Sequence, residues 1–207
     1  LFGIVLALAI SCSESRVTRA PVSVAPTAEA KPMDTEAVAA TVALDTHLFE
    51  RYVILGSSAS AGFNIQLDTG APTRLADYFE AGLFTGSKLA FDGSTEMTFL
   101  DPEGIAGKAV TRALAEDPTL VIGADFLFWF FYGAGGPGNT LAFRRERLEA
   151  GIALLDQFDC PVLVGDLPNM AGAAGGMIPI ASMPPADSFD DANSRIRAWA
   201  ASKANVI

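Results

Sequence analysis

Small residues and hydroxyl groups follow the first short apolar run of the globular region, where they could support nucleophilic chemistry. The run 51–56 ends in Gly56, and Ser57 and Ser58 come directly after it, followed by Gly62. Small residues let the backbone turn sharply, which places a hydroxyl above the edge of a sheet. A helix that began here would point free N–H groups at an anion or oxyanion. The same residues also suit an ordinary turn between a strand and a helix, so both interpretations stay open.

A serine nucleophile needs a neighbouring base, and the sequence contains a single histidine, His47. His47 precedes the run that Ser58 follows. About five extended residues span roughly 15–17 Å, so we expect His47 near the opposite edge of the sheet and in contact with solvent. One histidine and two cysteines also exclude a Cys/His zinc cluster. We expect neither a metal nor a cofactor.

Alternating strands and helices are predicted to position the serines. Short apolar runs bounded by glycine or proline predict buried strands, and longer segments with helical spacing of apolar residues predict helices. This alternation indicates an α/β fold with a parallel sheet between two layers of helices, a three-layer αβα arrangement. Ligands of such sheets bind at the carboxyl ends of the strands. The predicted strands are 51–56, 119–123, 161–165 and the opening of a further strand at 205–207, and the predicted helices are 72–82, 104–115, 141–158 and 187–203.

Three short motifs in chain order resemble the blocks of the SGNH, or GDSL-type, serine hydrolases. The first is similar to a Gly-Asp-Ser turn, with Ser57 in place of the aspartate and Ser58 in the position of the nucleophile. The second is similar to a strand ending in Gly-x-Asn, with Asp125 in place of the asparagine. The resemblance covers about residues 48–207, and its motifs are Gly56-Ser57-Ser58 with trailing Gly62, Gly123-Ala124-Asp125, and the strand end 164–170.

The resemblance implies a flavodoxin-like parallel sheet and serine-dependent hydrolysis of acyl or acetyl esters. Ser58 would attack the carbonyl, and its N–H would hold the oxyanion together with the N–H of Gly104 or Gly107 and the side chain of residue 125. An ionised Asp125 would repel the oxyanion, so it would contribute there only when protonated. The alternative is that Asp125 caps a helix beginning at Phe126.

The resemblance also implies an Asp-x-x-His motif after the last strand, which would supply the base. No such motif occurs before the sequence stops at Ile207. We therefore expect a fragment that lacks the catalytic acid and base at its C-terminal end. A non-catalytic binding domain on the same fold is the alternative.

A glycine-rich loop offers a competing motif. Residues 133–138 satisfy the pattern G-x-G-x-x-G, a helix is predicted to follow, and Asp166 comes after the next strand. These features are typical of dinucleotide-binding enzymes. Pro137, however, removes a donor from the supposed phosphate turn, and the unit falls in the middle of the chain. We favour a simple loop between two helices.

Two further segments are candidates for the walls of a site. The aromatic run 126–132 is expected to pack in the core, with the alternative that some of its rings line an acyl pocket. The stretch 170–185 is rich in glycine, alanine, methionine and proline, and we expect a long loop that acts as a lid or substrate wall. Cys160 is expected to be a buried strand residue.

The first residues resemble an export signal. Residues 1–11 are uncharged and nearly all apolar, and Ala9-Ile10-Ser11-Cys12 resembles the lipobox at which bacterial lipoproteins are lipidated. We expect 1–12 to be a signal peptide with its lipidation site at Cys12, 13–46 a flexible linker, and 47–207 the hydrolase-like domain. The expected location is the bacterial cell envelope, with the protein held by a lipid anchor, or else secreted or periplasmic.

The overall charge restricts the partners. Asp and Glu total 24 against 14 Lys and Arg, which gives a formal net charge of −10. Such a chain is repelled by phosphate backbones, so we expect no nucleic-acid partner. The expected partners are a small-molecule, lipid or carbohydrate ester as substrate and a membrane reached through Cys12.

Overall fold

The computed structural model describes residues 46–64, 73–82, 86–133, 140–176, 178–185 and 188–207. The predicted signal peptide with Cys12 and the predicted linker up to residue 45 lie outside the described residues. No helix in the described part of the chain is both long enough and apolar enough to cross a membrane.

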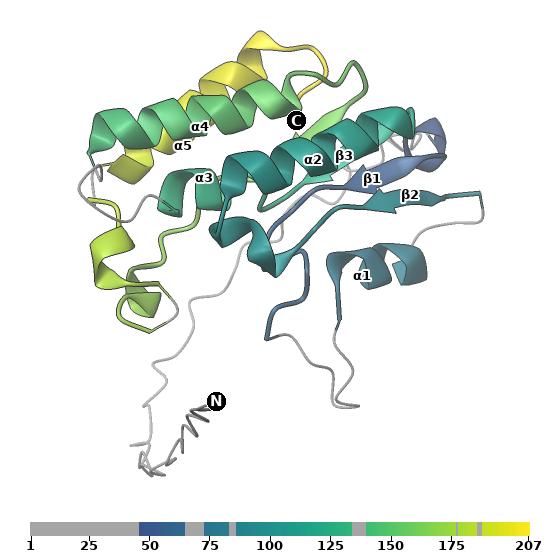
Figure 1. Ribbon diagram of the computed structural model, residues 1–207. Coiled ribbons are helices and arrows are strands. Elements are labelled where there is room, and N and C mark those ends of the chain that lie inside the picture. Colours follow the sequence, from purple (N-terminus) through teal and green to yellow (C-terminus); the bar gives the residue numbers. More distant parts are fainter. Residues whose placement is uncertain (1–45, 65–72, 83–85, 134–139, 177, 186–187) are drawn as a thin grey trace, which may run out of the picture. The chain divides into compact units, whose positions relative to one another are not determined.

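Four parallel strands form the sheet at the centre of the described region (Figure 1). Their order is β2-β1-β3-β4, with Val53 beside Val121 and Ile122 beside Leu163. β1 and β3 are buried throughout, as expected of strands covered on both faces. The predicted parallel α/β arrangement is therefore confirmed. The strands are β1 (Tyr52–Ile54), β2 (Leu89–Asp92), β3 (Leu120–Gly123) and β4 (Val162–Val164).

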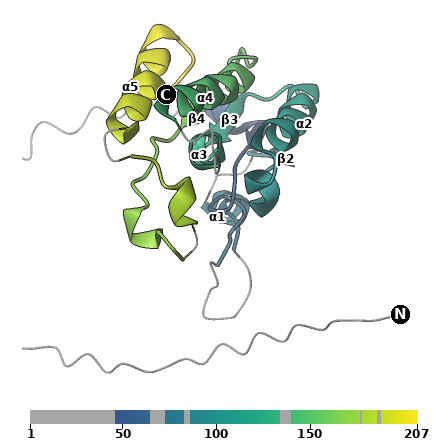
Figure 2. The same ribbon diagram turned by 60° about the vertical axis from the view of Figure 1, so that its left-hand side comes forward.

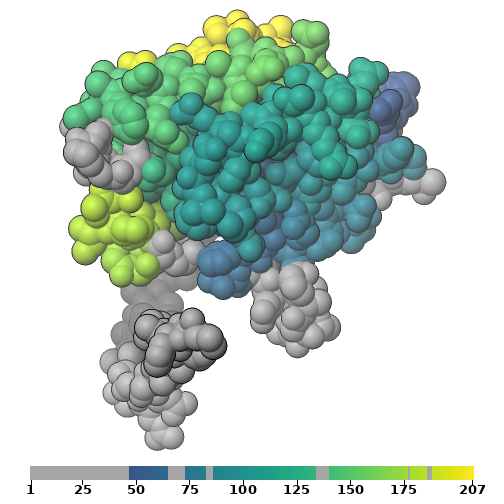
Figure 3. All heavy atoms as spheres, in the orientation of Figure 1, coloured from purple at the N-terminus to yellow at the C-terminus, as the bar shows by residue number. Residues whose placement is uncertain are grey.

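Helices lie on both faces of the sheet. Successive side chains of β1 point to opposite faces, and since all of them are apolar or aromatic, each face is covered by helices. Val53 belongs to the large core formed with α2, α3, α4 and α5, whereas Tyr52 and Ile54 belong to a smaller core formed with α1. Figures 1 and 2 show α1 on the opposite side of the sheet from α2 and α4, and in Figure 3 those two helices cover the sheet. The helices are α1 (Leu75–Gly82), α2 (Pro102–Ala115), α3 (Phe128–Tyr132), α4 (Leu141–Leu155) and α5 (Ser188–Ser202).

Local signals explain where the two longer helices of the main layer begin. Asp101 accepts a hydrogen bond from the Gly104 N–H at 3.0 Å, and Pro102 occupies the first turn, where a missing N–H costs nothing. Thr140 caps α4 in the same way through the Phe143 N–H at 3.2 Å. Both helices were predicted from the sequence, and the caps refine their starts.

Two features differ from the sequence-based predictions, and a third agrees with them. β2 was not predicted; it is an edge strand of four residues, all only half-buried. Cys160 was expected in a buried strand, but it lies half-buried in the bend before β4, because pairing of that strand starts only at Val162. The further strand expected at 205–207 begins to form: Ile207 donates to the Val162 carbonyl at 2.9 Å and accepts from the Val164 N–H at 3.0 Å.

Candidate functional site

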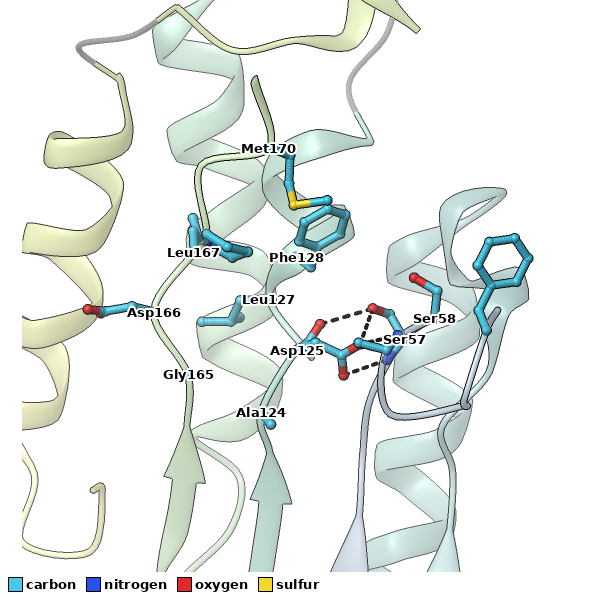
Figure 4. A pocket seen from close by; sticks show the side chains of 13 residues that line it. Ser57, Ser58, Ala124, Asp125, Leu127, Phe128, Gly165, Asp166, Leu167 and Met170 are labelled. Atoms are coloured by element: carbon cyan, nitrogen blue, oxygen red, sulfur yellow. Dashed lines mark hydrogen bonds between the residues drawn. The ribbon is translucent and has the colours of Figure 1, made fainter. Parts of the chain in front are cut away.

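A pocket of about 330 Å³ opens at the carboxyl ends of β1, β3 and β4 (Figure 4). The chain leaves β1 toward β2 on one side and returns to β3 on the other, so the loops that follow β1 and β3 diverge at this edge. The pocket therefore lies where ligands of open parallel sheets bind. Its lining residues are Ser57, Ser58, Ala59, Phe63, Ala124, Asp125, Leu127, Phe128, Gly165, Asp166, Leu167, Pro168 and Met170.

The segment after β1 is a tight series of turns, and no helix begins there. The Ala61 N–H donates to the Ser57 carbonyl at 2.9 Å, and the Phe63 N–H donates to the Ser58 carbonyl at 2.9 Å. Gly62 has a positive φ of 77°, and a Cβ at this position would lie 2.2 Å from the Thr73 carbonyl oxygen. Only glycine satisfies both conditions, which explains the glycine that trails the serines.

One carboxylate holds this turn together. The Asp125 side chain accepts hydrogen bonds from the N–H groups of Ser57 (2.9 Å), Ala59 (2.9 Å) and Ser60 (3.1 Å). It also accepts from the hydroxyls of Ser57 (2.7 Å) and Ser60 (2.6 Å). These bonds from the turn to the Asp125 carboxylate are visible in part as dashed lines in Figure 4. Asp125 thus fills the position in which the turn would otherwise bind an anion.

The helix-cap interpretation of Asp125 is wrong. The neighbouring helix α3 begins at Phe128, its N-cap residue is Leu127, and no side chain caps it. The Asp125 carboxylate faces β1 instead, since five donors of the turn converge on it there. Each of these contacts uses Asp125 as an acceptor, so the geometry assigns it the task of anchoring the serine turn.

Ser58 is the serine of the turn whose hydroxyl and N–H stay free within the described residues. Ser57 and Ser60 are 1% and 3% exposed, and both hydroxyls are bound to Asp125. Within the described residues, neither the Ser58 hydroxyl nor the Ser58 N–H has a hydrogen-bond partner. Figure 4 shows the hydroxyl pointing toward the side of the pocket that holds Phe128. Ser58 can therefore offer both a nucleophilic oxygen and a backbone donor to the same bound molecule.

Three other sequence candidates lie away from this pocket. Gly104 and Gly107 are inside α2, where the Gly104 N–H is already donated to Asp101, and neither residue lines the pocket. Neither is therefore placed to donate to an oxyanion beside Ser58. His47 lies in the short 3-10 helix Thr46–Phe49, before the amino end of β1, and its Nδ1 is 2.7 Å from Glu50 Oε1. The expected separation of His47 from Ser58 is confirmed.

The opposite wall of the pocket is apolar. It consists of Leu127 and Phe128 from the start of α3 and of Leu167, Pro168 and Met170 after β4. Phe128 stacks on Tyr132 with ring centroids 4.4 Å apart. The aromatic run divides between two places: Phe128 lines the pocket, and its neighbours in the run are buried in the core. The buried neighbours are Phe126, Phe130, Phe131 and Tyr132.

Two side chains from neighbouring helices, neither of them predicted as a support from the sequence, hold the segment after β4. The Tyr132 hydroxyl donates to the Pro168 carbonyl at 2.7 Å and accepts from the Met170 N–H at 3.0 Å. Asn193 of α5 accepts from the Leu167 N–H at 2.7 Å and donates to the Leu167 carbonyl at 3.1 Å. Burial raises the pKa of Tyr132, so its hydroxyl keeps its proton at neutral pH. The backbone of this wall forms no regular secondary structure, but its polar groups at Leu167, Pro168 and Met170 have hydrogen-bond partners.

A buried cation fixes the far end of the same segment. Arg144 of α4 is fully buried and donates to the carbonyls of Phe131 and, at 2.8 Å, Ser182. Its guanidinium carbon lies 5.5 Å from the centre of the Phe131 ring, a cation–π distance. Burial lowers the pKa of Arg144. The stretch predicted as a lid or wall is thus anchored near both of its ends.

The pocket contains little free charge. Asp166 is ion-paired with Arg197 of α5, and in Figure 4 its side chain points toward that helix and away from the pocket. The lining residues that the structure describes include no lysine, arginine or histidine. Nor do three or more acidic, histidine or cysteine side chains come together among the described residues in a way that would hold a metal ion.

The glycine-rich loop does not follow a strand. Residues immediately before Gly133 form α3, and the Gly133 N–H donates to the Trp129 carbonyl at 2.8 Å as part of that helix end. A dinucleotide fingerprint needs the glycines between a strand and a helix. Residues 134–139 lie outside the described residues. The helix before the loop argues against the dinucleotide interpretation.

Comparison with family models, with curated proteins and with solved structures found no match for this chain.

Proposed function

We propose that the protein hydrolyses carboxylic esters with Ser58 as nucleophile. The observation that carries the proposal is a serine whose hydroxyl and N–H are both without partners in the described part of the chain, at the mouth of an apolar pocket. The strand order β2-β1-β3-β4 supports a three-layer, flavodoxin-like arrangement, in which ligands bind where the loops after β1 and β3 separate. The resemblance to SGNH hydrolases supports the same nucleophile.

The reaction would proceed in two steps at Ser58. The Ser58 oxygen attacks the ester carbonyl carbon while a base takes the hydroxyl proton, and the Ser58 N–H donates to the oxyanion that forms. Collapse of this intermediate transfers the proton to the departing alcohol and leaves the acyl group on Ser58. Water then attacks the acyl-serine and releases the acid, and the serine regains its proton. Asp125 keeps the turn in one shape through both steps.

The base is the part of the proposal that the described residues do not supply, since His47 is at the wrong end of β1. The pairing of Ile207 with Val162 and Val164 runs parallel to β4. A strand continuing in this direction reaches the edge of the sheet at which Ser58 lies. We propose that an Asp-x-x-His motif following this strand provides the base.

The proposed location is the bacterial cell envelope. It rests on the likeness of 9–12 to a lipobox, with Cys12 as the lipid-bearing residue. An apolar anchor of this kind would keep the hydrolase close to ester-containing envelope components.

A non-catalytic binding domain is the second candidate function. The observation that favours it is the lack of a histidine beside Ser58 within the described region. On this reading the pocket binds an apolar molecule without transforming it. The two candidates differ in whether a bound ester is cleaved.

The test is hydrolysis of p-nitrophenyl butyrate by the full-length protein and by Ser58→Ala. The proposal expects at least a thousandfold loss of kcat/KM in Ser58→Ala, because removal of a nucleophile leaves only residual catalysis. Ser202→Ala, at the end of α5, is the matched control and should keep full activity. Activity retained in Ser58→Ala would exclude this nucleophile, and an inactive wild-type protein that still binds apolar ligands would identify a binding domain.

A further inference from the structure

We propose that the pocket binds the uncharged alkyl chain of an acyl group several carbons longer than acetyl. Tyr132 and Asn193 position the wall after β4, which determines the length of chain that is preferred. This inference names a substrate class and rests on the proposed hydrolysis at Ser58. It is carried by the chemistry of the lining, by the size of the pocket and by the way its wall is held.

The lining offers a bound polar group almost nothing to pair with. Five apolar side chains, from Leu127, Phe128, Leu167, Pro168 and Met170, face the space beside Ser58. The polar groups of Ser57 and Asp125 are consumed by their mutual hydrogen bonds, and Asp166 is paired with Arg197. A sugar or a charged acyl group would lose its hydration here without compensation, whereas an alkyl chain gains by leaving water.

The size of the pocket exceeds what an acetyl group needs. Its volume of about 330 Å³ lies within the range of sites that enclose small organic molecules. Two carbons leave most of this space unfilled, and a longer chain contacts Phe128 and Met170 as well as Ser58. Each methylene buried in such a space strengthens binding by roughly fourfold.

The wall is held firmly enough to discriminate between lengths. Tyr132 bonds to the backbone at Pro168 and Met170, and Asn193 bonds to both backbone groups of Leu167. Three of the apolar lining residues are therefore carried by backbone that buried or half-buried side chains fix in place. A wall that is already ordered loses less conformational entropy when an alkyl chain binds. The binding free energy therefore becomes more favourable with each further methylene that contacts the wall.

Tyr132 and Asn193 touch neither Ser58 nor the pocket itself. They are positioning residues that act through Leu167, Pro168 and Met170. Their removal should change which acyl group is preferred more than it changes the chemical step.

The first experiment measures binding without hydrolysis. Full-length Ser58→Ala is titrated with 2-butanone, 2-hexanone, 2-octanone and 2-decanone, neutral ligands that cannot be cleaved, and affinity is followed by NMR. We expect affinity to rise about three- to fourfold per methylene up to the length that fills the pocket. Equal affinities for all four ketones would overturn the inference. Because no catalysis is involved, this result stands even where the proposed hydrolysis fails.

The second experiment compares esters of two lengths in variants of the wall. For wild type we expect p-nitrophenyl octanoate to exceed the acetate in kcat/KM, and for Met170→Ala and Tyr132→Phe we expect that ratio to fall about tenfold. Tyr78→Phe, on the exposed surface of α1, is the matched control and should leave the ratio unchanged. An equal loss for both esters in Tyr132→Phe would show a purely structural tyrosine and overturn its positioning role.

Discussion

The two irregular segments that line the pocket are held in opposite ways. The turn after β1 converges on a single anion, the Asp125 carboxylate, which collects donors from three residues. The segment after β4 is held at separate points by a phenol, an amide and a buried guanidinium from three different helices. A convergent arrangement fixes the backbone on both sides of Ser58, whereas a distributed one shapes a surface. Damage to the first should be all-or-none, and damage to the second should be graded.

The largest loss of stability is expected from substitution of Asp125, on which the donors of the turn converge. Asp125→Ala leaves three N–H groups and two hydroxyls without their acceptor, among them those of the buried Ser57 and Ser60, and we expect the free energy of unfolding to fall by about 3–5 kcal/mol. Asp125→Asn keeps the shape but presents an amide N–H₂ to groups that are themselves donors, so about 2 kcal/mol should be lost. Urea unfolding of each variant measures these changes.

The exposed Asp159, in the bend before β4, is the matched control for this experiment. Asp159→Ala should stay within about 0.5 kcal/mol of wild type. Should Asp125→Ala prove no less stable than Asp159→Ala, the turn after β1 would not depend on a single anion, and the contrast between the two segments would disappear.

A smaller effect is expected where the wall is held at one of its separate points. Asn193→Ala removes the partners of the N–H and the carbonyl of Leu167, a buried residue, and should cost about 1–3 kcal/mol. Asn169→Ala, which loses one bond to the Ala171 N–H at an exposed position, should cost about 0.5 kcal/mol or less. Thermal unfolding of both variants, followed by circular dichroism, separates them. Equal losses would mean that the amide of Asn193 is not a support of the wall.

The smallest loss of stability is expected away from the pocket, at the ion pair between Asp191 of α5 and Arg145 of α4. Asp191 accepts hydrogen bonds from Arg145 and Arg195, and the Arg145 bond lowers the Asp191 pKa. A carboxyl group with a lowered pKa in the folded state contributes stability that is present above the unfolded pKa and lost as pH falls through the folded value. Asp191→Asn should therefore be slightly less stable than wild type above about pH 5, and this difference should shrink as pH falls toward the lowered folded-state pKa of Asp191.

Urea midpoints at pH 7 and pH 3 test this dependence. Asp190, the exposed neighbour of Asp191 in the first turn of α5, provides the comparison through Asp190→Asn. A gap between Asp191→Asn and wild type that persists unchanged at pH 3 would contradict an origin in the charged carboxylate.

The fold was predictable to the extent that burial leaves a pattern in the sequence. β1 and β3 are continuous apolar runs because both faces are covered, and α2 and α4 carry a cap and apolar spacing. β2 was not predicted because it is a half-buried edge strand of four residues that ends in Asp92. It has neither a continuous apolar run nor a helix cap with apolar spacing. Cys160 was misplaced by a few residues since an apolar run does not show where strand pairing begins.

The site was predictable only in its local part. Ser58 was found because a turn that follows a strand is encoded by neighbouring small residues. The supports of the wall could not be found in this way: Tyr132 and Asn193 bond to residues 36 and 26 positions away, and their partners are backbone groups that leave no mark in the sequence. Asp125 was found by resemblance, but its partners lie 65 to 68 positions earlier, and a local rule therefore suggested a helix cap.

The hydrogen bond of 2.7 Å between Ser57 and Asp125 joins the turn after β1 to the segment after β3, with the hydroxyl as donor and the carboxylate as acceptor. The two side chains are complementary as they stand. An acid at both positions would set like charges against each other, and for that reason neither residue can be judged apart from its partner.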